Sequence, residues 1–130
     1  MMDESGKGDD VWGGRSYREI PAWEKSMDLA GSVCLLVAGW KEREQGRALA
    51  EEAERTVWDV PGLIAEGWAM MGNRELISHA YRALGRLARL DTLMLLGVRL
   101  GHMDHYDDAL VLEVRRMLRG MIRHTRDQAN

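Results

Sequence analysis

The sequence is most constrained by a long helical hydrophobic repeat between Asn73 and Leu100. Its apolar residues recur every three or four positions, as on one face of an α-helix. They are Ile77, Ala80, Leu84, Leu87, Met94 and Val98. Asn73 is the predicted N-cap, Glu75 lies in the first turn, and Gly101 follows as a stop signal. Such a helix is about 42 Å long at 1.5 Å per residue, so it needs a long helical partner to cover its stripe.

Three more segments show the same periodicity. One begins near Pro21, one runs from about Glu44 to Met71, and one runs from about Asp107 to Arg126. The predicted stripe of the first segment is Trp23, Met27, Ala30, Cys34 and Val37. That of the second is Leu49, Ala53, Val57, Val60, Ile64 and Trp68. That of the last is Leu110, Val114, Met117 and Met121. The repeat of the second segment keeps its phase across Pro61, so we predict a kink there and not a helix end.

These patterns predict an all-α fold, an up-down four-helix bundle with long second and third helices. The 130 residues fit one domain, Leu, Met and Ala are good helix formers, and long β-branched runs are missing. Residues 19–130 form the predicted bundle. Residues 1–18 are rich in Gly, Asp and Ser and are predicted to be a flexible tail, in which Trp12 is a candidate for docking on the body or on a neighbouring subunit.

The sequence favours a cytoplasmic protein that is not an enzyme. We find no signal peptide and no apolar run near the ~20 residues of a membrane span. Cys34, the single cysteine, lies in an apolar run and is expected to be a buried free thiol. No catalytic triad, phosphate loop or dinucleotide fingerprint is present, so no cofactor is expected.

The acidic and histidine residues favour structural roles over a metal site. Glu66 and Asp91 lie near predicted apolar stripes and are expected to pair with Arg82, Arg86 or a helix N-terminus. A di-metal bundle site needs repeated Glu-x-x-His motifs, which the chain lacks. A second acidic and histidine-rich group is expected to form a solvated connection that caps the fourth helix. That group is His102, Asp104, His105, Asp107 and Asp108.

Charge is unevenly distributed along the chain. The net charge is −3, with −6 in residues 1–70 and +3 in residues 71–130. Arginines follow helical spacing on the third and fourth segments: Arg82, Arg86 and Arg89, then Arg115, Arg116, Arg119, Arg123 and Arg126. Two interpretations stay open, because guanidinium groups bind phosphates as well as carboxylates. One is contact with RNA or DNA, and the other is a solvated face or ion pairing with the acidic half of a neighbouring subunit.

Large apolar residues exceed what a thin bundle easily buries. Exposed apolar patches usually mark interfaces, so we expect these residues to contribute to a homo-oligomer. They are Trp40, Trp58, Trp68, Met70 and Met71.

Several segments resemble the four-helix bundle proteins related to the bacterial 23S rRNA intervening-sequence protein. WEKSMDLA at 23–30 resembles the family's opening, VPGLIAEG at 60–67 its S-I/V-P-A-N-I-A-E-G signature, and YRALGRLARLDT at 81–92 its third helix, which LGH at 100–102 ends. The resemblance implies a homopentamer. In one branch, the accessory variability determinants of diversity-generating retroelements, it also implies nucleic-acid and reverse-transcriptase binding through a basic surface.

This chain departs from the family where that basic surface lies. The family's Q-x-x-R-A segment is acidic here, at 51–56; its signature Asn is Leu63, and a Glu of its third helix is Arg89. We therefore expect an oligomeric structural or interaction protein with no membrane partner, and keep a nucleic-acid-binding accessory protein as the alternative.

Overall fold

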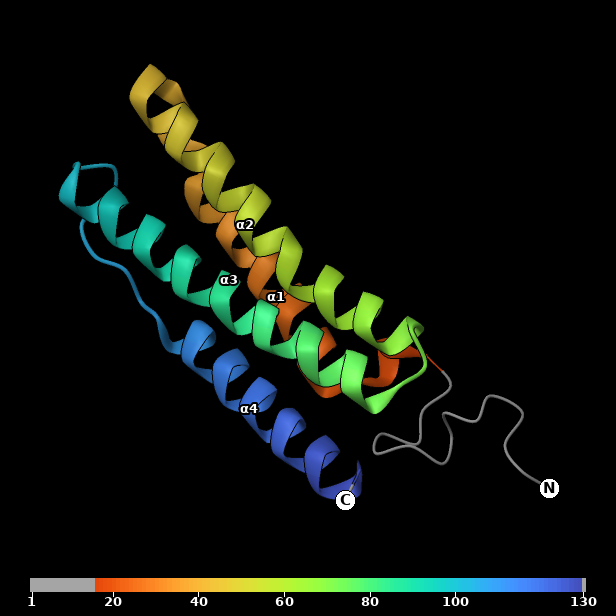
Figure 1. Cartoon of the computed structure of the whole chain (residues 1–130). Helices are drawn as coiled ribbons and strands as arrows, with labels where there is room; N and C mark the ends of the chain where they lie inside the picture. The colour runs from red at the N-terminus through yellow and green to blue at the C-terminus, as the bar shows by residue number, and fades with distance from the viewer. Residues whose placement is uncertain (1–15, 130) are drawn as a thin grey trace.

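The computed structural model describes residues 16–129 and is all-helical over that range, which confirms the predicted fold class (Figure 1). Two short 3₁₀ helices accompany the four long helices. The elements are η1 (Tyr17–Glu19), α1 (Pro21–Val37), η2 (Ala38–Glu42), α2 (Glu44–Ala69), α3 (Asn73–Arg99) and α4 (Ala109–Ala129).

The four helices form a closed square in which each one runs antiparallel to the next (Figure 1). α1 packs on α2, α2 on α3, α3 on α4, and α4 returns beside α1, whereas the diagonal pairs have no Cα atoms within 8 Å of each other in the described part of the chain. The α2–α3 pair has the most extensive contact, as expected for the two longest helices. The outer edge between α1 and α2 is therefore opposite the outer edge between α3 and α4.

Local sequence signals set most helix ends. Pro21 occupies the first turn of α1, where its missing N–H costs nothing. The Asp107 carboxylate accepts a hydrogen bond from the Ala109 N–H at 3.0 Å, so the predicted capping of the fourth helix is confirmed. The predicted N-cap of the third helix is wrong: Gly72 is the N-cap, and Asn73 is already helical. The Glu75 carboxylate folds back against Gly72, into space that a Cβ would fill.

Pro61 lies inside α2, and the helix continues through it. The ring removes the N–H that would bond to the carbonyl of Val57, but the side chains of Val60, Pro61 and Ile64 are all buried in the core. Continuation is thus confirmed, while the kink itself stays a prediction. Beyond Ala69 the chain turns sharply, and Met71 takes a left-handed backbone conformation (φ 64°).

The core confirms the predicted stripes of the second and third helices more closely than that of the first. The buried positions of α2 and α3 include Ala53, Val57, Val60 and Ile64, and Ala80, Leu87 and Met94. In α1, the predicted stripe is displaced by one residue as far as Cys34, while Val37 is buried as predicted. The buried side chains of α1 are Ala22, Ser26, Leu29, Val33 and Val37.

The error in α1 has a packing cause. The small residues Ala22 and Ser26 take buried positions of α1. The larger Met27 lies at the solvent edge, 46% exposed. The Ser26 hydroxyl is satisfied because it donates to the Trp23 carbonyl at 2.8 Å.

Trp40 closes one end of the bundle from inside. Its indole is 3% exposed and stacks on the His102 ring, with centroids 5.8 Å apart. It packs directly on Gly97 of α3, where a Cβ would overlap the indole, and its carbonyl lies against Gly46 of α2. The expectation that Trp40 contributes to an oligomer interface is therefore wrong. His102 is likewise half-buried and is not part of a solvated connection.

The first described residues are ordered against the other end of the bundle. Ser16 caps η1 by accepting from the Arg18 N–H, and the Tyr17 ring makes edge contacts with Trp23 and Trp68. For residues 16–18 the predicted flexible tail is wrong. Trp12, with its predicted docking, lies outside the described residues.

None of the helices between residues 16 and 129 has the length and apolar character needed to cross a membrane.

Candidate functional site

The outward side of α1 and its edge with α2 carry exposed apolar side chains, which we call together the apolar face. It consists of Met27, Leu35 and Trp58, which are 46%, 81% and 52% exposed. The Trp58 indole N–H donates to the Cys34 thiol at 3.3 Å, which joins the two helices at this edge. Cys34 is therefore a half-buried free thiol and not the fully buried one expected.

Two carboxylates border the apolar face on α1. Glu24 and Asp28 are exposed, and their spacing to Leu35 places all three on one side of the helix. Neither carboxylate forms an ion pair with any described residue. Glu54 differs, because it pairs with Lys41 at 2.9 Å. The apolar face is thus bordered by negative charge that no residue between 16 and 129 neutralises.

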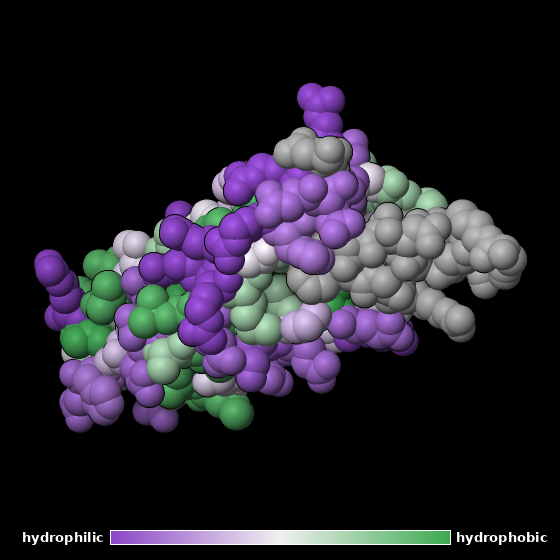
Figure 2. Space-filling model, turned by 90° about the horizontal axis from the view of Figure 1, so that it is seen from below, coloured by the Kyte–Doolittle hydropathy of each residue, from purple (hydrophilic) through white to green (hydrophobic). Residues whose placement is uncertain are grey.

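The opposite outer edge, between α3 and α4, carries a groove of about 400 Å³. We call it the arginine groove. Its apolar part comes from both helices and its charged part from α4 alone. The lining residues are Tyr81, Leu84, Arg119, Ile122, Arg123 and Arg126. Figure 2 shows the molecule from below, the side on which α4 lies lowest in Figure 1. Hydrophilic residues cover most of that face, with hydrophobic residues between them.

The arginines of this groove have no carboxylate partners within residues 16–129. The groove lining contains no acidic residue, and Arg119, Arg123 and Arg126 are exposed. Ile122 is buried, Leu84 is half-buried and Tyr81 is exposed, so the groove combines an apolar base with a cationic rim. Such a groove fits an anionic group attached to an apolar one.

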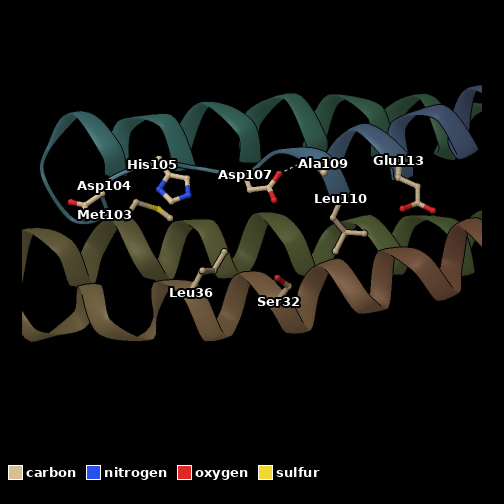
Figure 3. A pocket seen from close by; sticks show the side chains of 9 residues that line it. All are labelled: Ser32, Leu36, Met103, Asp104, His105, Asp107, Ala109, Leu110 and Glu113. Atoms are coloured by element: carbon tan, nitrogen blue, oxygen red, sulfur yellow. Dashed lines mark hydrogen bonds between the residues drawn. The ribbon is translucent and has the colours of Figure 1, made fainter.

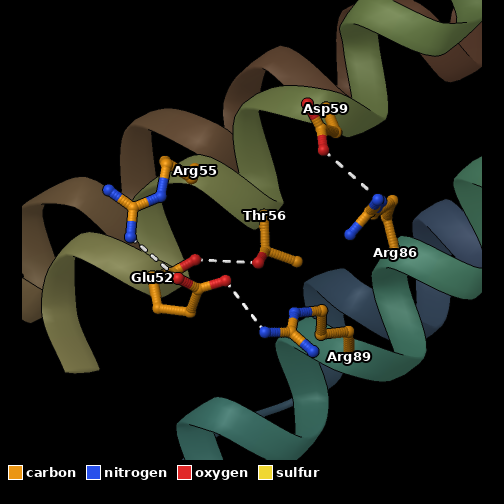
Figure 4. A network of polar contacts seen from close by, with 6 residues as sticks. All are labelled: Glu52, Arg55, Thr56, Asp59, Arg86 and Arg89. Atoms are coloured by element: carbon orange, nitrogen blue, oxygen red, sulfur yellow. Dashed lines mark hydrogen bonds and ion pairs between the residues drawn. The ribbon is translucent and has the colours of Figure 1, made fainter. Parts of the chain in front are cut away.

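The predicted arginine sites of α3 and α4 have different surroundings. Arg86 pairs with Asp59 at 3.3 Å, and Arg89 pairs with Glu52 at 2.8 Å, both across the α2–α3 contact (Figure 4). Among the other predicted residues, Arg115 is half-buried, while Arg82, Arg116, Arg119 and Arg123 are exposed without an ion pair in the described structure. The free positive charge therefore lies mainly on α4.

Glu52 is the centre of the α2–α3 network. Its carboxylate accepts hydrogen bonds from Arg55 and Arg89, each at 2.8 Å, and its backbone carbonyl accepts from the Thr56 hydroxyl (Figure 4). The Arg55 and then the Arg89 guanidinium lower the pKa of Glu52 below its ordinary value of 4.5. This network joins α2 to α3 and gives Arg89 a carboxylate partner within the subunit.

The other predicted interface residues differ in exposure. Met70 and Met71, at the turn after α2, are 57% and 65% exposed. Trp68 is half-buried beneath the Tyr17 ring. Trp58 is thus the one tryptophan among the predicted three that presents a large exposed surface in the described chain.

A wider cleft of about 680 Å³ lies between α1 and the connection before α4 (Figure 3). Its lining mixes apolar, acidic and histidine side chains: Ser32, Leu36, Met103, Asp104, His105, Asp107, Ala109, Leu110 and Glu113. The Asp107 carboxylate is occupied by the cap of α4, and Glu113 lies 3.6 Å from the Lys25 ammonium. No group of three or more potential ligands able to hold a metal occurs within the described residues.

Glu66 and Asp91 do not pair with arginines as expected. Glu66 is exposed, with the His79 ring nitrogen 3.9 Å away, so the prediction for Glu66 is wrong. Asp91 is half-buried beside Tyr106. Burial raises the pKa of the Tyr106 hydroxyl, and the Asp91 carboxylate raises it further.

Sequence reasoning missed Tyr81 and Leu35 as surface residues. Each lies next to a residue of a buried or half-buried row, so an apolar side chain there looks like part of a broad stripe. The available signal is spacing: Leu35 shares its face with Glu24 and Asp28, and two charged neighbours indicate a solvent-facing position.

Comparison with known protein families, with characterised proteins and with solved structures finds no match to this chain.

Proposed function

We propose that this chain is a non-catalytic, cytoplasmic helical-bundle protein that assembles with copies of itself and acts as a structural or interaction module. A homopentamer is the proposed state, on the basis of the family that the sequence resembles. The apolar face is the observation that carries the proposal of self-assembly.

The physical reason is the cost of leaving this face in water. Burying apolar surface contributes about 25 cal/mol per Å², and a large aromatic side chain at the centre of an interface contributes more than most other residues. Trp58 and Leu35 lie on the solvent side of a complete core, so the bundle does not need their apolar surface for its own packing. A second subunit that covers them gains this free energy.

The test compares two neighbouring leucines of α1. Leu35 belongs to the apolar face, whereas Leu36 faces the acidic cleft beside α4. We expect wild-type protein to be oligomeric by native mass spectrometry. Leu35→Arg should shift it toward monomer, because an interface would have to bury the added charge, and Leu36→Arg should retain the wild-type mass. A monomeric wild type at tens of micromolar would contradict self-assembly.

A second candidate, nucleic-acid binding, is favoured by the unpaired arginines of α4. Arg116, Arg119 and Arg123 are exposed on one helix, where they can contact successive phosphates. Fluorescence anisotropy with a mixed-sequence RNA would then give an affinity that falls with salt, by a slope of about 0.7 per phosphate neutralised. Arg119→Glu/Arg123→Glu should abolish binding. Binding that these changes leave intact would reject this surface.

A further inference from the structure

We propose that the apolar face and the arginine groove are the two halves of one head-to-tail interface, in which the apolar face of one copy seats in the arginine groove of the next. This inference rests on the proposed self-assembly. It adds which two surfaces meet and that neighbouring subunits are arranged head to tail.

The position of the two surfaces is the first argument. The apolar face lies on the outward side of α1 and on its edge with α2, whereas the arginine groove lies on the α3–α4 edge across the square of helices. Two different surfaces on opposite sides of a subunit make a heterologous contact. Repetition of such a contact gives a closed ring or an open filament, not a two-fold dimer.

Charge complementarity is the second argument. The arginine groove contains three guanidinium groups and no carboxylate, while Glu24 and Asp28 border the apolar face without ion-pair partners in the described structure. Arg119 and Arg123 are four residues apart, as are Glu24 and Asp28, so helices lying side by side can form two ion pairs in one register. Contact of either surface with a copy of itself would bring like charges together.

Apolar complementarity is the third argument. The groove is lined by the exposed Tyr81, the half-buried Leu84 and the buried Ile122, and the half-exposed Trp58 is the largest apolar side chain of the apolar face. An indole seated there would have guanidinium groups near its ring, a favourable cation–π arrangement. Aromatic residues together with arginine are the types that dominate binding energy at protein interfaces.

The experiment uses two full-length charge-reversal variants. One is Arg119→Glu/Arg123→Glu, and the other is Glu24→Arg/Asp28→Arg. Each alone places like charges in the interface, so we expect its self-association to weaken by about 100-fold. In an equimolar mixture each altered surface meets a complementary one at every junction between the two variants, so mixed assemblies should return. A closed ring of five has an odd number of subunits and keeps one like-charged junction, so we expect the mixed assemblies to be open chains or even-membered rings. Native mass spectrometry measures both results.

The experiment also includes a control variant outside the interface and a pair of variants that remove charge without reversing it. Glu42→Arg/Asp104→Arg reverses two exposed acids outside both surfaces and should assemble like wild type. Circular dichroism checks that every variant is helical. If a reversal variant fails to fold, Arg119→Gln/Arg123→Gln and Glu24→Gln/Asp28→Gln replace the pair, and each must weaken assembly.

The outcomes separate this inference from the proposed function. A monomeric wild type rejects self-assembly and with it the interface. A wild type that assembles, with both reversal variants still assembled, supports self-assembly and overturns the head-to-tail pairing. Disassembly of each variant without recovery in the mixture overturns it as well. Binding of an acidic peptide or RNA to the arginine groove of a fully assembled oligomer would also overturn the head-to-tail pairing, because the groove would then not be covered by a neighbouring subunit.

Discussion

Gly97 shows how a single residue sets the distance between elements. The Trp40 indole lies on the backbone of α3 at this glycine, in space that any side chain would occupy. A second glycine, Gly46, lets the start of α2 approach the carbonyl of Trp40 and the His102 ring. The end of the bundle therefore closes because two positions have no Cβ.

We expect Gly97→Ala to lower the free energy of unfolding by about 1–3 kcal/mol, as overpacking of a core does. The matched control is Gly85→Ala in the same helix, where a Cβ meets nothing within 4 Å. That change should raise stability by about 0.5–1 kcal/mol, since glycine is a poor helix residue. Urea unfolding followed by circular dichroism measures both. Equal effects of the two substitutions would show that Trp40 does not pack as described.

Residue-scale features were the hardest to predict from the sequence. The burial of Trp40 depends on Gly97, 57 positions away, and no local pattern reveals that pairing. The exposed position of Glu66 and its approach to His79 depend in the same way on how α2 and α3 are aligned. Spacing along one helix gives the face of a residue but not its partner.

At the scale of elements, the sequence predicted most of the architecture. Proline and glycine signals and the hydrophobic repeat are local, so they located α2 and α3 within two residues at each end. The burial stripe of α1 was misplaced by one residue, because a helix with apolar residues on a wide arc has no unique inner side until its neighbours are known. The tail prediction failed at Tyr17, whose ring packs on two tryptophans.

The α2–α3 contact predicts how stability depends on acidity. Because the folded state lowers the pKa of Glu52, its contribution is present above the ordinary value of 4.5 and is lost as pH falls through the lower folded pKa. Glu52→Gln should therefore unfold more easily than wild type at pH 7, and this difference should shrink toward pH 3. Thermal unfolding across that range measures it. A difference that grows on acidification would contradict this assignment.

For the whole molecule, the uneven charge of the chain has a spatial meaning. The sequence shows an acidic first part and a basic second part, and the bundle places α1 and α2 on one side and α3 and α4 on the other. The sequence could predict this polarity but not which charges stay unpaired. Arg86 and Arg89 pair with carboxylates of α2, while the arginines of the groove have no ion-pair partner among the residues that the structure describes.

This polarity predicts a salt effect on assembly. Raising the ionic strength from 0.1 to 1 M shortens the Debye length from about 10 to about 3 Å, which screens exposed ion pairs while leaving apolar contact intact. We expect the dissociation constant between subunits to rise with salt without complete disassembly. Sedimentation velocity over a salt series measures it, with the Glu42→Arg/Asp104→Arg variant as a control for general charge effects. Tighter association at high salt would mean that apolar burial alone holds the subunits together.

The order of the helices around the square also bears on how the chain reaches its native state. Every contact between long helices joins neighbours along the chain, apart from the one in which α4 returns to α1. Contacts between nearby segments cost little loop-closure entropy, and proteins rich in them fold in microseconds to milliseconds. We therefore expect the α2–α3 hairpin to form early and the α1–α4 seam to close last. The α1–α2 and α3–α4 edges would then form before that seam closes, so a newly made chain would carry both of its proposed assembly surfaces before its own fold is complete.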